Sequence, residues 1–355
     1  MDPANFAQGD ESGPVIDFID PIVPEDRLHP SFKALTSQEG FSPAKELIAS
    51  MMHYFGNPDG NFVEQFQTTG FDARIWELYL FATFHELGVA FDNSHAAPDF
   101  HCIGVGSEFL VEATTVNPTM QNGRVTALPP TETNEEERNF FQNYLPIKYG
   151  SVLFNKLRRE YWNLDHVRGK PFGIAVQDFI TPTSMTSSGR SILEYVFGQR
   201  QDPTTTRQRT IPIENHSYGD KVIPSGFFYL PTAENVGAVF FNPAATISKF
   251  NRIGLLAGFG SDRVQMTRVG NWYDHSTGTI EASFRRQEVR VGEYEESWVE
   301  GLNVMLNHRA NVPFDPDLFQ GAAIHYQEND HGEVRSFLPQ NHPFGSMTQI
   351  HVISE

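Results

Sequence analysis

Residues 98–115 read PDFHCIGVGSEFLVEATT, with Asp99 before one apolar run and Glu112 near the end of the next. Both runs are rich in β-branched and aromatic residues and are separated by glycine, a pattern that is typical of paired strands. The two acids are 13 residues apart. A hairpin of this length would bring both carboxylates to one end of a sheet, so the stretch predicts two strands that each carry one acid.

The segments around this hairpin predict helices and one further strand. Upstream, FSPAKELIASMMHYFGN and DARIWELYLFATFHELG have apolar residues at helical spacing. One face of the second helix is expected to carry Ile75, Leu78, Tyr79, Ala82 and Leu87. Downstream, residues 138–164 are helical in pattern with a break near Pro146, and KPFGIAVQDF suits a buried strand. With a short strand at VAFDN, the predicted order is helix, three strands, helix, strand.

The rest of the chain predicts an arm, two loops and an extension. Residues 1–40 are rich in Pro, Asp and Ser and predict an extended arm. A polar loop is expected at 117–137. Residues 199–225 contain turn and basic residues without periodicity, which predicts a linker or long loop. Further strands are expected at NVGAVFF, TIEASFRRQEVRV and AAIHYQ, and a helix at ESWVEGLNVMLNHRA.

These segments together predict the fold class. We expect an α/β domain with a mixed sheet over residues 41–200, preceded by the 1–40 arm. Residues 225–355 are expected to form an α+β C-terminal extension whose role the sequence does not specify. A chain of 355 residues is long enough for two domains or one large domain.

Composition limits the classes of function. The chain is 39% hydrophobic and 13% aromatic, which predicts a folded globular protein. Its formal net charge of −18 argues against a general DNA-coating protein, because non-specific binding depends on cations that neutralise phosphates. A nuclease stays compatible with this charge, since an acidic metal site and a local basic patch can coexist with an acidic remainder.

Cysteine and histidine usage gives no metal or disulfide motif. The single cysteine, Cys102, excludes a disulfide within the chain, and the histidines form no HExxH-type helical pair that would indicate zinc. The first residues are acidic and lack an apolar signal-peptide core, and no segment approaches 18 apolar residues. We therefore expect a cytoplasmic protein that does not enter a membrane; the oligomeric state is left open.

The paired acids suggest metal-dependent phosphodiester hydrolysis. This reaction needs a divalent cation held by hard oxygen ligands, an activated water and a positive charge near the phosphate. Asp99, Glu112 and the carbonyl of Ala113 are the predicted ligands, and Glu77 on the preceding helix is the natural third acid. The simpler interpretations are that Glu77 lies on a solvated helix face and that Asp99 caps a turn.

The helix acid, the Pro-Asp pair, the spacer and Glu-x-Thr, in this order of elements, resemble the PD-(D/E)xK nuclease superfamily. The resemblance covers about residues 70–200 and implies a restriction-endonuclease-like αβββαβ core in which Asp99 and Glu112 bind Mg²⁺ or Mn²⁺. Thr114 stands where the family usually has lysine. Lys156 on the following helix is the candidate for a relocated lysine, as some members of the family carry it there, and Arg159 could supply only the charge.

The basic residues after the hairpin suggest a nucleic-acid partner. Lys148, Arg158 and Arg159 are the predicted contacts to DNA or RNA, although a solvated helix face explains the same residues more simply. The sequence before and after this motif also resembles a group of long bacterial proteins with no assigned role. Three functions therefore stay open: a divergent metal-dependent nuclease, a catalytically inactive nuclease-like module that binds nucleic acid or a protein partner, and a toxin-like or defence component.

Overall fold

The computed structural model describes residues 18–55, 60–121, 124–181, 184, 189–202, 210–274, 281–330 and 332–354. The chain divides into two compact units, each built from separate segments. Unit 1 comprises Met1–Gly88, Ala244–Glu300 and Gln340–Glu355; unit 2 comprises Val89–Pro243 and Gly301–Pro339. These units combine segments from both of the predicted ranges 41–200 and 225–355, because contacts in space, rather than continuity of the chain, define them.

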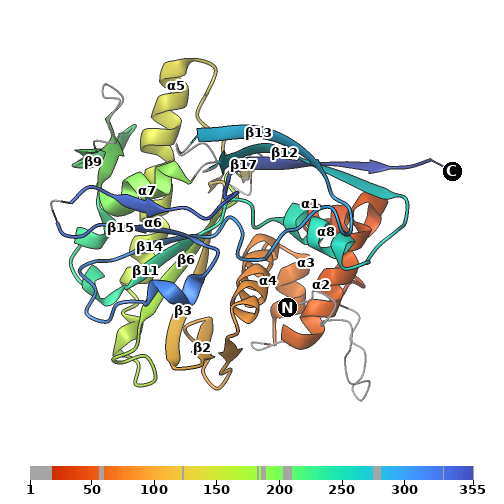
Figure 1. Cartoon of the computed structure of the whole chain (residues 1–355), viewed down its shortest axis with the longest axis horizontal. Helices are drawn as coiled ribbons and strands as arrows, with labels where there is room; N and C mark the ends of the chain where they lie inside the picture. The colour runs from red at the N-terminus through yellow and green to blue at the C-terminus, as the bar shows by residue number, and fades with distance from the viewer. Residues whose placement is uncertain are drawn as a thin grey trace. The chain divides into compact units, whose positions relative to one another are not determined.

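Unit 2 is built around a mixed sheet of eight strands among the described residues (Figure 1). In spatial order the strands are β1 Ala90–Phe91, β2 Phe100–Gly104, β3 Ser107–Val116, β6 Phe172–Asp178, β11 Ala238–Phe241, β14 Asn303–Leu306, β15 Ala323–Tyr326 and β16 Arg335–Phe337. Strands β1, β2 and β3 pair in antiparallel fashion, and β3, β6 and β11 run parallel. The predicted mixed α/β class and the hairpin at 98–116 are thereby confirmed.

Both faces of this sheet are covered. Helices α6 Leu145–Leu157 and α7 Arg190–Phe197 pack their apolar side chains on one face, against Leu110, Ile174 and Phe241. On the other face, four phenylalanine rings stack edge to face: Phe109, Phe240, Phe314 and Phe319. All seven residues of β6 are buried, as a strand covered on both faces requires. The prediction of a buried strand at 170–179 is confirmed.

The connection from β3 to β6 contains more structure than the sequence suggested. A hairpin forms from β4 Met120–Gln121 and β5 Arg124–Val125, and α5 Asn134–Asn139 leads through a π-helical turn, Phe140–Tyr144, into α6. Pro146 lies in the first turn of α6, so the predicted helix break precedes it. The loop prediction for 117–137 is therefore correct only in part: residues 117–119 and 126–131 form no helix or strand, whereas the β4–β5 pair and the capped start of α5 organise the rest.

In the predicted linker or long loop at 199–225, the described residues 199–202 and 210–225 are not structureless; residues 203–209 lie outside the described part of the chain. The described residues contain the hairpins β7 Gln199–Gln201 with β8 Thr210–Pro212, and β9 Asn215–Tyr218 with β10 Lys221–Pro224. Backbone pairing, which requires no apolar periodicity, accounts for the difference. Among the described residues of unit 2, short 3-10 helices include Tyr161–Asn163, Phe227–Tyr229, Ala233–Asn235 and Pro316–Phe319.

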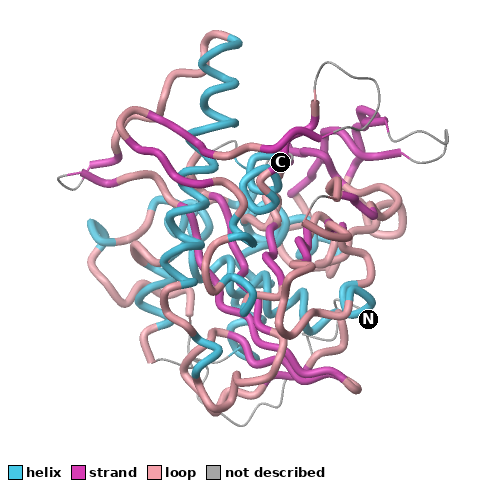
Figure 2. The backbone as a smooth tube through the Cα atoms, turned by 90° about the vertical axis from the view of Figure 1, so that its left-hand side faces the viewer, coloured by secondary structure: helices cyan, strands magenta, loops and turns pink. Residues whose placement is uncertain are grey.

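Unit 1 combines helices with a three-stranded antiparallel sheet; Figure 2 separates the two by colour. The helices are α1 Pro30–Ser37, α2 Ser42–Phe55, α3 Phe62–Gln67, α4 Phe71–Glu86 and α8 Ile247–Leu256, with 3-10 turns at Glu25–Arg27 and Glu39–Phe41. The strands are β12 Val264–Asp274, β13 Glu281–Glu288 and β17 Pro343–Val352. Helices α2 and α8 approach so closely that a Cβ on Gly254 would lie 2.4 Å from the Pro43 carbonyl oxygen.

Three predictions for the remaining elements need correction. Residues 18–40 are not an extended arm: they contain α1, whose Phe32 and Leu35 are fully buried, while residues 1–17 lie outside the described part of the chain. Helix α4 has no single apolar face, since most of its residues are buried and these residues lie on all sides of the helix. The stretch 296–310 is not a helix and contains β14. The predicted helix at 41–57 is confirmed over Ser42–Phe55, and the strands predicted in 235–241, 279–291 and 322–327 are confirmed over the described residues of those ranges.

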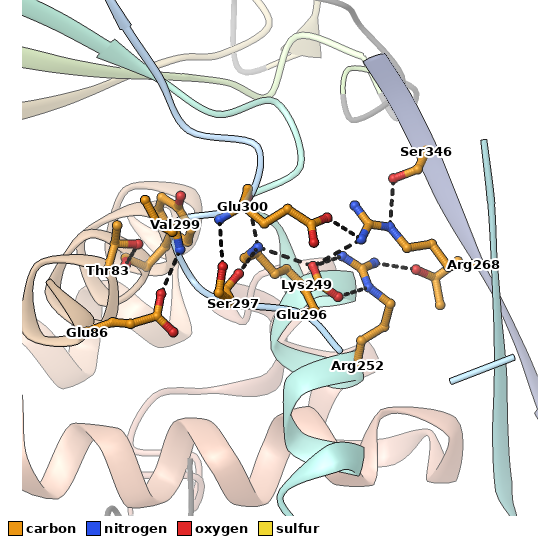
Figure 3. Close-up of polar contacts among 12 residues, drawn as sticks. Thr83, Glu86, Lys249, Arg252, Arg268, Glu296, Ser297, Val299, Glu300 and Ser346 are labelled. Atoms are coloured by element: carbon orange, nitrogen blue, oxygen red, sulfur yellow. Dashed lines mark hydrogen bonds and ion pairs between the residues drawn. The ribbon is translucent and has the colours of Figure 1, made fainter. Parts of the chain in front are cut away.

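A buried ion cluster stabilises unit 1 (Figure 3). Lys249 and Arg252 from α8 both bond to Glu296, at 3.2 Å and at 2.6 and 2.7 Å, respectively. Arg268 from β12 bonds to Glu300 at 2.6 Å. Burial alone would raise the pKa of Glu296, but Arg252, Arg268 and Lys249 outweigh it and hold that pKa well below its usual value. The glutamate therefore stays ionised without contact with water.

Candidate functional site

The two acids predicted as metal ligands lie opposite each other in unit 2. The register that pairs Phe100 with Val111 places Asp99, the residue immediately before β2, opposite Glu112. The Asp99 N–H donates to Glu112 Oε2 at 3.3 Å, and the Ala113 N–H donates to Asp99 Oδ2 at 2.7 Å. Each acid therefore accepts a hydrogen bond from the other strand, which fixes both carboxylates at the end of the hairpin.

Lys156 reaches this pair from helix α6. Leu110, Glu112 and Val116 alternate onto the sheet face that α6 covers, so the glutamate points toward the helix. The Lys156 ammonium donates to Glu112 Oε1 at 2.5 Å, with 26% of the lysine side chain exposed and 7% of the glutamate side chain exposed. The structure thus brings together three of the four predicted catalytic residues.

Tyr161, which is not among the site residues predicted from the sequence, is a fourth member of the cluster. Its hydroxyl donates to the same Glu112 oxygen at 2.6 Å, and its ring packs against Phe172. Burial raises the pKa of Tyr161, and the charges of Glu112 and Asp99 raise it further, with a smaller opposing effect of Arg159. The phenol is therefore a proton donor at neutral pH, and it leaves the negative charge on the acids.

The carbonyl of Ala113 lies on the same edge of β3 as Asp99. In an extended strand the N–H and C=O of one residue point to the same neighbour, and the Ala113 N–H bonds to Asp99. Continuing the register places Pro98 opposite Ala113, and proline has no N–H to donate to that carbonyl. The carbonyl can therefore join the two carboxylates as a third oxygen ligand.

This donor set fits a hard divalent cation. Mg²⁺ and Mn²⁺ prefer carboxylate and carbonyl oxygens, and the three groups belong to neighbouring positions at the open end of the hairpin. Two carboxylates against one ammonium group leave the cluster with an excess of negative charge. Thr114, two residues after Glu112 and on the same face, is half-buried and adds a hydroxyl but no charge.

Glu77, the predicted helical acid, belongs to unit 1. It lies on α4 and accepts a hydrogen bond from Arg74 at 2.6 Å, with 12% of its side chain exposed. The alternative that it lies on a freely solvated helix face is therefore wrong. Its predicted part in catalysis stays a prediction.

The predicted nucleic-acid contacts lie along α6 and just after it. Arg158 and Arg159 are exposed at the end of the helix that supplies Lys156. Lys148, about 12 Å before Lys156 at 1.5 Å per residue, is half-buried over the Tyr144 ring and bonds to Thr119. Burial lowers its pKa, and Lys221 lowers it further. The two arginines are thus better placed than Lys148 to meet a phosphate backbone.

A cavity of about 310 Å³ in unit 2 is lined by none of the predicted site residues. Asp178 lies in its wall at the end of β6, where the Tyr149 and Ser184 hydroxyls and the Ile180 N–H donate to it. Burial raises the pKa of Asp178, and these three hydrogen bonds partly offset that effect. Such a buried, fully bonded acid has a structural explanation, and the cavity does not change the assignment of the site.

Comparisons with protein-family models, with curated proteins and with solved structures find no match to this chain. Within the described residues, no helix has the length and apolar character needed to cross a lipid bilayer.

Proposed function

We propose that the chain is a divergent metal-dependent phosphodiesterase that cleaves DNA or RNA. The observation that carries the proposal is the cluster of Asp99, Glu112 and Lys156, which combines two oxygen ligands with one cation at the end of a hairpin. The lysine comes from α6 and supplies the positive charge that Thr114 cannot supply.

The topology supports a restriction-endonuclease-like interpretation of unit 2. Strands β1, β2 and β3 form an antiparallel meander, and the chain crosses through α6 to β6, which is parallel to β3. This is the order of strands and helix expected for that core. The first helix of the αβββαβ pattern would be α4, which belongs to unit 1.

Each residue of the cluster has a separate part in the proposed reaction. Asp99, Glu112 and the Ala113 carbonyl would hold Mg²⁺ or Mn²⁺, which activates a water and withdraws charge from the phosphate. Water adds to phosphorus and gives up a proton to solvent, the bond to the leaving oxygen breaks, and that oxygen takes up a proton from solvent. Lys156 stabilises the charge that develops on the phosphate, while Tyr161 keeps the Glu112 carboxylate in position. Arg158 and Arg159 would bind the flanking backbone.

The test is to separate metal binding from cleavage. Asp99→Asn should abolish both calorimetric binding of Mn²⁺ and cleavage of plasmid, single-stranded DNA and RNA. Lys156→Met should leave the Mn²⁺ affinity within about threefold but lower the cleavage rate by about 10²- to 10³-fold, the usual cost of one lost electrostatic donor. Lys33→Met, which removes a partly exposed lysine of unit 1, is the matched control.

A catalytically inactive binding module is the second candidate. The observation that favours it is that Glu112 Oε1 already accepts from both Lys156 and Tyr161, which compensates its charge without a metal. Such a module would bind nucleic acid equally well as wild type and as Asp99→Asn, and would cleave none. Absence of Mn²⁺ binding by the wild type would overturn the phosphodiesterase proposal.

A further inference from the structure

A second group of metal-ligating side chains lies beside the hairpin, near the start of strand β2 and away from the turn between β2 and β3. Asp92, His95 and His101 offer three ligand atoms that all lie within 4.8 Å of one another. Asp92 directly follows β1, and its N–H donates to the His101 carbonyl at 2.9 Å. His95 belongs to the connection between β1 and β2, and His101 lies in β2. Strand pairing therefore fixes two of the three residues.

His101 is oriented as a metal-binding histidine usually is. Its side chain is 7% exposed, and Nε2 lies 2.6 Å from Glu108 Oε1. Lys170 also contacts Glu108, at 2.6 Å, which holds the carboxylate beside the imidazole. In the tautomer that donates Nε2–H to Glu108, the lone pair lies on Nδ1. Histidine ligands typically donate their second N–H to a carboxylate in this way.

The Nδ1 atom of His101 is the atom that points into the group. It is buried and makes no hydrogen bond among the described residues, although Asp92 Oδ2 is 3.3 Å away. Two ligands about 2.0–2.1 Å from a tetrahedral ion are themselves separated by about 3.3 Å. The separation of these two atoms is therefore the one that a shared tetrahedral ion requires.

His95 completes the group from the surface. It is exposed, stacks on His166 with ring centroids 3.8 Å apart, and has Nδ1 2.8 Å from the Ser94 hydroxyl oxygen. When Nδ1–H donates to Ser94, the lone pair lies on Nε2. Closing from at most 4.8 Å to about 3.3 Å needs a movement of about 1.5 Å or less, which an exposed side chain can make.

We propose that Asp92, His95 and His101 form a site for a zinc-class transition-metal ion, with a fourth position open to water. Two imidazoles and one carboxylate select Zn²⁺ or Co²⁺ over Mg²⁺, and three protein ligands with an open position are typical of catalytic zinc sites. The site is distinct from the oxygen-rich cluster at Asp99 and Glu112. It does not depend on the proposed function, although His101 and Asp99 are only two residues apart.

The test titrates Zn²⁺ and Co²⁺ into the full chain without a polyhistidine tag. The wild type is expected to bind one Co²⁺ with visible d–d absorption of a tetrahedral ion, and Zn²⁺ should displace it. His95→Ala should weaken this binding by at least about tenfold without disturbing the core, because the side chain is exposed. Asp92→Asn should have a similar effect. His351→Ala, which removes an exposed histidine of unit 1, is the matched control.

Two outcomes would overturn the proposal. One is the absence of a tight Co²⁺ site in the wild type; the other is equal affinity and stoichiometry in the wild type, His95→Ala and Asp92→Asn. Asp99→Asn separates this proposal from the proposed function. It should abolish Mn²⁺ binding at the oxygen-rich site and leave the Co²⁺ spectrum unchanged, so either site can fail alone.

Discussion

Each unit of the molecule contains a lysine bonded to a glutamate, but the two pairs have different surroundings. In unit 1, Lys249 and Glu296 are both 0% exposed, and Arg252 and Arg268 add two further cations. In unit 2, Lys156 is 26% exposed and Glu112 is joined by a second acid, Asp99. The first cluster has an excess of cations and is closed around Lys249 and Glu296, whereas the second has an excess of acids and is partly open.

This difference shows how a structural ion cluster is distinguished from a candidate site. Burial lowers the pKa of Lys249, and Glu296 and Glu300 oppose that shift, while both acids are already paired with the cations of the cluster. No substrate or cation can enter such a cluster without breaking it. An excess of carboxylates beside a partly exposed lysine, in contrast, can accept a divalent cation and a phosphate. Proximity of acids and bases alone would not have separated the two.

The largest effect is expected when Glu296 is replaced by Gln. This variant leaves Lys249, Arg252 and Arg268 buried with only Glu300 to balance them. Breaking a buried pair by removing one partner costs about 3–5 kcal/mol of unfolding free energy. Urea unfolding at pH 7 measures the loss, with the exposed neighbour Glu295→Gln as the control. A loss below about 1 kcal/mol would show that the cluster is less closed than its burial indicates.

A pH titration tests the same cluster from a neighbouring group. His342 is 4% exposed, and burial, reinforced by Lys249 and Arg268, lowers its pKa to about 4. Unfolding restores the ordinary value of about 6.5, so the unfolded chain binds the proton first and stability falls as the pH drops below about 6.5. The loss between pH 7 and pH 4 should be about 3 kcal/mol, at 1.36 kcal/mol per pKa unit.

The variant His342→Phe isolates this contribution from those of the carboxylates. Its unfolding free energy should vary less between pH 7 and pH 4 than that of the wild type, by about 3 kcal/mol. Equal pH dependence in the two proteins would mean that the pKa of His342 is the same in the folded and unfolded states. Neither burial nor the cations of the cluster would then lower that pKa.

Local patterns in the sequence were enough to predict the hairpin and its acids. The helical pattern of 138–164 also predicted the helix that carries Lys156, whereas the contact between Lys156 and Glu112 is seen only in the structure. These inferences succeed because strand pairing and helix periodicity are properties of short segments. Tyr161 was missed as a functional residue because its ring suits a core and only the fold shows where its hydroxyl points.

The predictions from the sequence fail where contacts between distant segments of the chain determine the structure. The pattern of Trp298, Val299, Leu302 and Met305 fits a helix, but Gly301 has a φ of +85° and packs closely on Asn242, and the following residues pair with β11 and β15. The buried ion cluster combines α8 and β12 with the segment around Glu296, and no local spacing predicts that meeting. The Asp92, His95 and His101 group likewise depends on strand pairing.

The smallest effect is expected from a change at Tyr161, in the partly open cluster of unit 2. Tyr161→Phe removes one hydrogen bond to Glu112 Oε1 but keeps the ring against Phe172. Because Lys156 still bonds to that oxygen, and because the tyrosine is half-buried, the expected loss of unfolding free energy is about 1 kcal/mol.

The Mn²⁺ affinity should change by less than about threefold, while the cleavage rate falls by about fivefold, because one bond worth about 1 kcal/mol positions the carboxylate. Tyr54→Phe on α2 is the matched control. A stability loss as large as that of Glu296→Gln would place Glu112 in a closed structural cluster like the one in unit 1, and would argue for the inactive module.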